Sequence, residues 1–295
     1  MIKIRIFTDF HKATDDPTSK YLESSGMKLD PDYNKTFCFT SGDDYTHVIL
    51  LNCPTPDISH IPKKNVIGIA MEPVQFLRGF APISPSIKLK DFIEYVQNYV
   101  GKYYVGDQFD LPKPFIERCR YRNSSIQMVP YPEKKKIMSI MISNKISAPG
   151  HKYRHMLVLE ILKHNLPVDI YGRGCVYYKQ YDVRFKGFFK DNEPYEDYKF
   201  HIAIENFESN HYFTEKIINP LLLNCSPIYL GCRNIDEYFP DSVIKLNGNV
   251  DLDIQMIRNI CENPEKYRKQ IDINKVKKTI SIKNIINEFF LTGSS

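Results

Sequence analysis

Short hydrophobic runs separated by polar segments recur along the whole chain. Residues 2–7 alternate apolar and charged positions, and continuous apolar runs follow at 48–52 and 66–71. Alternation and short apolar runs both predict β-strands, and uninterrupted runs are typical of buried strands in parallel sheets. Apolar positions over 87–100 have helical spacing, and 103–105 predicts a further strand.

The pattern becomes more regular after a segment rich in proline and charge at 129–136. That composition predicts an interdomain linker, so we expect an N-terminal α/β domain at 1–132 and a C-terminal domain at 133–295. Beyond the linker, predicted strands (137–143, 168–171, 201–205, 227–230, 243–246) alternate with helices (153–164, 214–224, and the sequence from 254 onward). The alternation predicts doubly wound parallel sheets in an α/β fold, and hence two Rossmann-like domains facing a cleft.

Composition and charge fit a globular protein with a small anionic ligand. The chain has 295 residues, of which 42% are hydrophobic and 25% charged, a typical globular balance. The formal net charge is +5, from 40 Lys and Arg against 35 Asp and Glu spread along the sequence. Because so small a surplus is no nucleic-acid signature, we expect no nucleic-acid partner; a phosphate-bearing small molecule fits at least as well.

Neither the cysteines nor the N-terminus indicate secretion. The seven cysteines include no C-x-x-C pair and are odd in number, which predicts free thiols and no zinc site. The first ten residues lack the apolar core of a signal peptide, and no apolar stretch approaches the roughly 18 residues of a transmembrane helix. We therefore expect a cytoplasmic protein with no transmembrane segment and no bound metal.

The segment from Phe200 to Ile218 carries the most specific chemistry. A predicted buried strand ends at Glu205 and Asn206, and after a polar loop a helix begins at Thr214, a good N-cap residue. Unpaired N–H groups at the helix start, together with Lys216 in its first turn, predict an anion site. Because a cation there repels the helix dipole, the alternative is an exposed Lys216 paired with Glu215 or Glu208.

Two further segments have candidate chemistry. Residues 143–154 again run from a strand through a polar loop into a helix, with Arg154 near the helix start. This pattern also predicts an anion site. The alternative is that Arg154 is a surface residue of the helix without a ligand. Glu72, followed by Pro73, ends an apolar strand where parallel sheets present catalytic groups. The alternative for Glu72 is a turn-capping role.

A D-x-D sequence, Asp251-Leu252-Asp253, resembles a divalent-metal motif. It stands directly before the helical positions 254–261, so we expect it to cap that helix. Gly172-Arg173-Gly174 lacks the third glycine of a dinucleotide fingerprint and predicts a turn at the edge of the binding pocket.

The run F-x-x-x-x-E-N-x-x-x-x-x-Y-x-T-E-K-I, followed by N-P-L-L-L-N-C-S-P-I-Y-L-G and a later Phe-Pro, resembles the signature region of the α-1,3/1,4-fucosyltransferases, glycosyltransferase family 10. The resemblance implies a GT-B transferase with its donor nucleotide in the C-terminal half. It implies inversion at the anomeric carbon, GDP-fucose or a related nucleotide sugar as donor, a glycan acceptor, and no cofactor. A cytoplasmic bacterial or viral version without a Golgi anchor is expected.

The resemblance also implies roles for residues. Lys216 binds the diphosphate, Glu215 the ribose hydroxyls, and Tyr212 and Asn206 border the nucleotide and sugar. Arg154 clamps the diphosphate, with Ser143 and Asn144 contributing from the loop and Lys152 as the alternative cation. Glu72 is the general base that accepts the proton of the acceptor hydroxyl. Glu205 either orients the loop or contacts ligand.

Two alternatives to a fucosyltransferase remain open at this stage. One is the same fold with a different nucleotide deoxy-sugar. The other is a catalytically silent protein that binds a nucleotide sugar.

Overall fold

The computed structural model describes residues 1–9, 17–19, 34–73, 89–118, 133–178, 182–190 and 192–291. They form two compact units, each built on one six-stranded sheet. The N-terminal unit comprises 1–123 together with 209–212 and 280–295, and the C-terminal unit comprises 124–208 and 213–279. Two α/β domains with parallel sheets, as predicted from the sequence, are confirmed.

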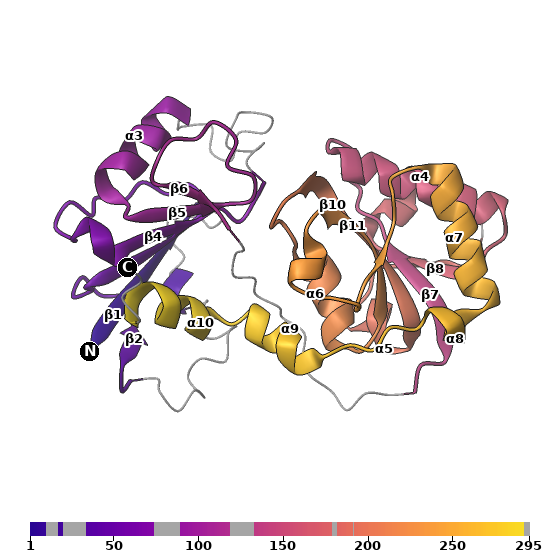
Figure 1. The fold of residues 1–295 in the computed structure, drawn as a ribbon. Helices are drawn as coiled ribbons and strands as arrows, with labels where there is room; N and C mark the ends of the chain where they lie inside the picture. Colours follow the sequence, from indigo (N-terminus) through magenta and orange to yellow (C-terminus); the bar gives the residue numbers. More distant parts are fainter. Residues whose placement is uncertain are drawn as a thin grey trace. The chain divides into compact units, whose positions relative to one another are not determined.

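The sheet of the N-terminal unit has the strand order β2-β1-β3-β4-β5-β6, and all its neighbouring strands are parallel (Figure 1). Its strands are β1 (Ile2–Thr8), β2 (Phe37–Phe39), β3 (His47–Leu51), β4 (Val66–Ile69), β5 (Lys102–Val105) and β6 (Phe115–Glu117). The order reverses between β1 and β3, so this sheet has its topological switch point there.

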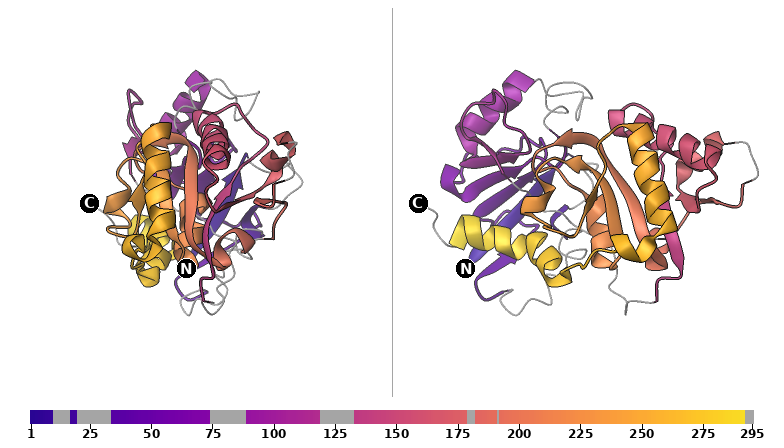
Figure 2. Two further views of the ribbon diagram at one scale, coloured as in Figure 1. Left: turned by 90° about the vertical axis from the view of Figure 1, so that its right-hand side faces the viewer. Right: turned by 45° about the vertical axis from the view of Figure 1, so that its right-hand side comes forward.

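Both faces of this sheet are covered. Helix α3 (Leu89–Tyr99) packs Phe92 and Val96 against one face, together with the buried Tyr103 of β5. Helix α10 (Ile282–Ile286) and the π-helical turn at Asn287–Leu291 pack against the other, where Ile286 is fully buried (Figure 2). The last described residues of the chain thus complete the core of the unit that its first residues begin.

The sheet of the C-terminal unit has the order β12-β11-β10-β7-β8-β9, which is the Rossmann order. Its strands are β7 (Lys136–Met141), β8 (Val168–Tyr171), β9 (Phe185–Gly187), β10 (Tyr198–Ser209), β11 (Ser226–Cys232) and β12 (Ile244–Lys245). Its helices are α4 (Pro149–Lys163), α5 (Glu193–Glu196), α6 (Glu215–Leu222), α7 (Val250–Glu262), α8 (Pro264–Tyr267) and α9 (Ile273–Thr279). The 3-10 turns lie at Lys63–Asn65 in the N-terminal unit and at Arg173–Tyr177 and Ile235–Glu237 here.

Alternate residues of the strands divide this unit into two layers. Buried apolar residues of β7, β8 and β10 meet Leu157 and Ile161 of α4 and Ile257 of α7 in one core. Helix α6 lies on the other side of the sheet from α4 and α7 (Figure 1). The register pairs Ser139 of β7 with His201 of β10, so these two polar residues are neighbours on the sheet.

The sequence predictions hold for every long element and differ at the ends. Helix α4 begins at Pro149, four residues before the predicted start, because proline is favourable at the first helical position. Strand β10 continues to Ser209 through residues predicted as a loop. The start of the predicted helix at 87–88 and of the predicted linker at 129–132 lie outside the described residues. The units also differ from the predicted division, because residues 280–295 belong with the N-terminal unit.

Candidate functional site

A cavity of about 390 Å³ opens in the C-terminal unit where β7 and β10 adjoin. It is lined by residues that follow β7, by the turn after β8 and by the middle of β10. In this sheet β7 and β10 flank the topological switch point, since the chain leaves β7 toward β8 and β9 and later returns on its other side. Open α/β sheets bind ligands at the carboxyl ends of the strands at such a point.

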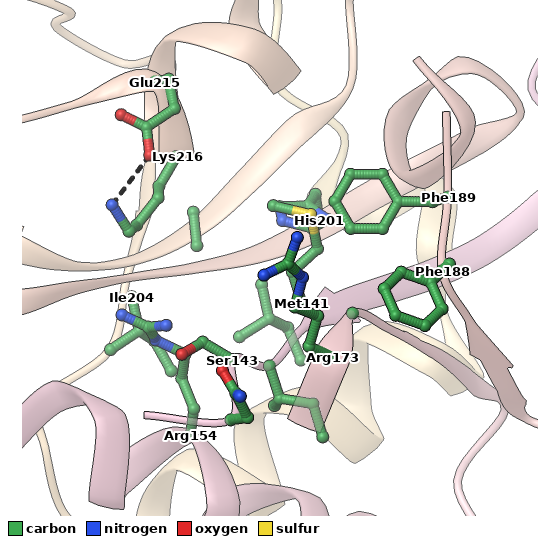
Figure 3. A pocket seen from close by; sticks show the side chains of 15 residues that line it. Met141, Ser143, Arg154, Arg173, Phe188, Phe189, His201, Ile204, Glu215 and Lys216 are labelled. Atoms are coloured by element: carbon green, nitrogen blue, oxygen red, sulfur yellow. Dashed lines mark hydrogen bonds and ion pairs between the residues drawn. The ribbon is translucent and has the colours of Figure 1, made fainter. Parts of the chain in front are cut away.

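One side of the cavity carries two cations, Arg154 of α4 and Lys216 of α6 (Figure 3). The two side chains come from helices on opposite faces of the sheet, and each is mostly buried. Lys152, the alternative cation on α4, is exposed and does not line the cavity. The structure thus brings Arg154 and Lys216, rather than Lys152, to a common pocket.

The start of α6 is held by a buried carboxylate. Thr214 is the N-cap, and its side chain accepts from the backbone N–H of Lys216. Glu205 lies within β10 with a fully buried side chain, and it accepts hydrogen bonds from the Thr214 backbone N–H at 2.7 Å and from the Thr214 hydroxyl at 2.8 Å. Of the two roles open for Glu205, the contacts assign it the orientation of the loop.

Glu205 also compensates the unusual position of Lys216. The Lys216 Nζ lies 3.5 Å from a Glu205 oxygen and 2.9 Å from Glu215 Oε1, and it donates to Thr214 Oγ1 at 3.0 Å. Burial lowers the pKa of Lys216, but the two carboxylates outweigh it and hold that pKa above its ordinary value. Lys216 is therefore a fixed positive charge at the cavity. It pairs with Glu215, as one sequence interpretation had it, and also with the buried Glu205.

Arg154 is fixed by Asn206. Its Nη2 donates to the Asn206 side-chain oxygen at 2.6 Å, and the residue is only 6% exposed. Asn206 itself does not line the cavity. The structure places Asn206 as the residue that orients Arg154.

Ser143, Asn144 and Glu215, to which the family resemblance gives ligand contacts, also line the cavity. The Ser143 hydroxyl accepts from the Lys145 backbone N–H and so fixes the loop after β7. The Asn144 carbonyl accepts from the Tyr177 hydroxyl, which joins this loop to the turn after β8. The loop after β7 therefore lines the cavity with residues whose backbone is held in place.

Two glycines permit the close approach of backbones at the site. A Cβ on Gly150 of α4 would lie 1.8 Å from the Glu205 carbonyl oxygen, so only glycine lets the helix start touch β10 there. Gly172 has a φ of +104° and a Cβ there would lie 2.2 Å from the Ile142 carbonyl oxygen. Gly172 and Arg173 line the cavity, in agreement with the predicted pocket-edge turn.

The other side of the cavity is aromatic and was not predicted from the sequence. Phe188, Phe189 and His201 line it, away from Lys216 (Figure 3). Phe188 is 75% exposed and lies under the Arg173 guanidinium. The available signal was the apolar pair directly after a short strand, which sequence patterning alone does not separate from a core position.

Glu72 and Tyr212 lie together in the N-terminal unit. Glu72 follows β4, and the Tyr212 hydroxyl lies 3.4 Å from its Oε2. Tyr212 is 1% exposed and belongs to the segment 209–212, which Asp107 ties to this unit through Ser209 and the Asn210 N–H. Tyr212, expected beside the nucleotide, does not line the cavity and contacts the predicted base instead.

The D-x-D sequence lies within the first turn of α7, and the N-cap is Asn249 rather than either aspartate. Asp253 is fully buried and accepts from the backbone N–H of Asn247, the backbone N–H of Gly248 and the Tyr153 hydroxyl. Its role is to fix the loop before the helix. No group of three or more His, Cys, Asp or Glu is arranged to hold a metal ion in the described part of the chain.

Three kinds of comparison relate the chain to known proteins. A model of the glycosyltransferase family 10 (fucosyltransferase) C-terminal region matches residues 131–286. GDP-fucose protein O-fucosyltransferase 3 of Danio rerio is 31% identical over 144 residues, covering 46% of this chain and 31% of the relative. Alpha-(1,3)-fucosyltransferase B of Drosophila melanogaster is 30% identical over 147 residues, covering 45% and 32%. The matched part thus spans about a third of each relative.

The fold is shared with solved glycosyltransferases. A crystal structure of an α1,3-fucosyltransferase superimposes with a TM-score of 0.56 at 15% identity, covering 99% of this chain and 89% of that one. A structure of an α1,3-fucosyltransferase with GDP-fucose gives 0.53 at 15% identity, covering 100% and 91%. The two Rossmann-like domains are those of a GT-B fold. None of the helices described here is long and apolar enough to cross a membrane.

Proposed function

Because the chain belongs to glycosyltransferase family 10, the fucosyltransferases, we propose that it transfers fucose from GDP-fucose to a hydroxyl of a glycan acceptor with inversion at the anomeric carbon. The observation that carries the proposal is the cavity of the C-terminal unit, with two cations on one side and aromatic rings on the other. A nucleoside diphosphate has an anionic diphosphate that matches the cations and an aromatic base that matches the rings. Fucosyltransferase relatives and neighbours with GDP or GDP-fucose favour this donor over other nucleotide sugars.

We assign the cationic end to the diphosphate. Arg154 and Lys216 are fixed by Asn206 and Glu205, so their charges are in place before the leaving group develops its own. Preorganised charges of this kind stabilise a departing diphosphate without a reorganisation cost. We propose that these two side chains, rather than a divalent metal, neutralise it.

Glu72 is the proposed general base. It accepts the proton of the acceptor hydroxyl while that oxygen attacks the anomeric carbon from the side opposite the diphosphate. The C–O bond to the acceptor forms as the bond to the β-phosphate oxygen breaks, which inverts the configuration. The Tyr212 hydroxyl near Oε2 of Glu72 restricts the orientation of that carboxylate.

Thermal unfolding in the presence of GDP, UDP, dTDP and GDP-fucose, each with EDTA and with Mn²⁺, tests the donor. A ligand at a hundred times its Kd stabilises the folded state by about 2.7 kcal/mol. We expect stabilisation by GDP and GDP-fucose that EDTA leaves unchanged. Stabilisation only by another nucleotide contradicts fucose as the sugar, and stabilisation by none contradicts a nucleotide-sugar site.

The Glu72→Gln variant separates an enzyme from a silent binding protein. Loss of a general base lowers a rate by about 10²–10⁴-fold, so transfer to a glycan acceptor, or slow hydrolysis of GDP-fucose, should fall by this factor while GDP affinity is kept. Glu94→Gln is the matched control, because Glu94 is an exposed glutamate on α3 of the same unit. Equal rates for wild type and Glu72→Gln exclude Glu72 as the base.

A further inference from the structure

We propose that His201 selects the nucleobase of the donor, by accepting a hydrogen bond on Nε2 from an N–H group of guanine. The inference rests on the proposed function, since it needs a nucleoside diphosphate in the cavity of the C-terminal unit. It names a specificity-determining residue at the aromatic end of that cavity, away from Arg154 and Lys216.

His201 is placed at the aromatic end by the sheet. It lies in the middle of β10, lines the cavity, and is 1% exposed. Figure 3 shows it beside Phe189 and away from Lys216. A ligand whose diphosphate lies at Lys216 therefore extends its other end toward His201.

The hydrogen-bond partners of His201 assign its tautomer. Ser139, its neighbour in register on β7, donates its hydroxyl proton to the Pro194 carbonyl. The Ser139 oxygen lies 2.8 Å from Nδ1 of His201. A serine hydroxyl has one proton, and a carbonyl only accepts, so Nδ1 must carry the proton that joins it to Ser139. In a neutral imidazole, Nε2 then has a lone pair and is an acceptor.

The acceptor on Nε2 is available to a ligand. Among the described residues, the polar partners of the His201 ring are the Ser139 hydroxyl at Nδ1 and the Pro194 carbonyl, which the same hydroxyl contacts. His201 lines the cavity, and we place Nε2, on the other side of the ring from Nδ1, toward a ligand bound there. Burial lowers the pKa of His201 to about 3, which keeps the ring neutral and Nε2 unprotonated near neutral pH.

The surroundings of Nε2 fit a base rather than a sugar. Aromatic rings stack on the faces of bases, and Phe188 and Phe189 line the same end. If Nε2 is the acceptor at the edge of a stacked base, it binds a base with N–H donors on that edge more tightly than a base without them. Guanine has two adjacent donors there, N1–H and the 2-amino group.

Calorimetric titration of the full chain with GDP and with inorganic pyrophosphate separates the two ends of the cavity. We expect His201→Asn to weaken GDP binding by about 10- to 100-fold, the range for leaving a buried donor unpaired. Asparagine retains a donor close to the position of Nδ1 but does not reach the position of Nε2. Pyrophosphate, which has no base, should bind wild type and variant equally.

His201→Gln is the second variant, because its amide reaches the position of Nε2 and can present an oxygen there. We expect it to recover part of the GDP affinity, and it keeps the test decisive if His201→Asn does not fold. Titration with IDP, which lacks the 2-amino group, shows whether that group or N1–H is the donor. A wild type that binds IDP as tightly as GDP assigns the bond to N1–H.

The failures of the two proposals are distinguishable. Unchanged GDP affinity in both folded variants, with wild type binding GDP, overturns the role of His201 and leaves the proposed function intact. Equal losses of GDP and pyrophosphate affinity also overturn it, since they show a general disturbance of the cavity. A wild type that binds neither GDP nor GDP-fucose overturns the proposed function and this inference together.

Discussion

Lys216 shows how one side chain is made usable by others. A lysine in the first turn of a helix opposes the helix dipole, and burial opposes its charge. The buried Glu205 offsets both effects, and the same carboxylate fixes the helix start through Thr214. The charge is thus held in place at the cost of a buried ion pair, an arrangement better explained by ligand binding than by stability.

Replacing Lys216 by Met should weaken GDP binding by about 10- to 100-fold, because a charged hydrogen bond to the diphosphate contributes about 1.5–3 kcal/mol. Lys152→Met is the control, since Lys152 is an exposed lysine on α4 outside the cavity. Titration calorimetry measures both. A wild-type Kd in Lys216→Met shows that the diphosphate does not lie at Lys216.

The sequence predicted single residues where the chemistry of a residue is unusual for its place. The anion site at Lys216 follows from a cation at a helix start, and the structure brings Arg154 to the same cavity. His201 carries no such signal, because a histidine inside an apolar strand looks like a core residue. Its partner Ser139 lies 62 positions earlier in the sequence, and the register of β7 with β10 brings the two together. The Pro194 carbonyl, which Ser139 contacts, comes from α5.

At the scale of elements, the contact of α4 with β10 depends on Gly150. Gly150→Ala places a methyl group against the Glu205 backbone. Because backbone atoms do not move aside as a flexible side chain does, we expect a loss of stability of about 3 kcal/mol, the upper range for overpacked interiors. The displaced helix should also carry Arg154 out of position and weaken GDP binding.

Gly42→Ala is the matched control. A Cβ there would meet only side-chain atoms, Asp44 Oδ1 at 3.3 Å and Thr40 Oγ1 at 3.5 Å, in an exposed turn. Urea unfolding should show a change below about 1 kcal/mol for this variant. Similar stabilities for the two alanine variants contradict the close packing at Gly150.

Helices and strands could be predicted from the sequence where the pattern of their own residues determines the secondary structure. The short apolar runs predict β3, β4 and β7, and the helical spacing of apolar residues predicts α3. The three-residue strands β2, β6 and β9 were not predicted. Three residues are too few to show an alternating pattern, and such strands form only because they pair with neighbouring strands. The end of β10 was predicted as a loop because its residues are polar.

At the scale of the whole molecule, two buried histidines make stability depend on pH. Burial lowers the pKa of His201 to about 3 and, together with the nearby Arg154 charge, that of His151 to about 4. Both stay neutral in the folded chain, whereas in the unfolded chain they bind protons below pH about 6.5. The unfolded state therefore gains protons first, and acid favours unfolding.

The free energy of unfolding should fall as the pH drops from about 6.5 toward 4, by up to about 1.4 kcal/mol per pH unit for each histidine. Urea unfolding at pH 7, 6 and 5, followed by circular dichroism, measures the slope. His201→Asn removes one of the two groups, so its slope should be shallower over this interval. Identical slopes for wild type and variant show that His201 is not buried in the neutral form.

The N-terminal unit is discontinuous in the sequence, and this bears on how the chain folds during synthesis. Its strands are translated before the C-terminal unit, but the sheet face covered by Ile286 stays uncovered until residues 282–291 have been made. The segment that holds Tyr212 against Glu72 also arrives after β6. The N-terminal unit therefore completes its core only after the C-terminal unit has been translated.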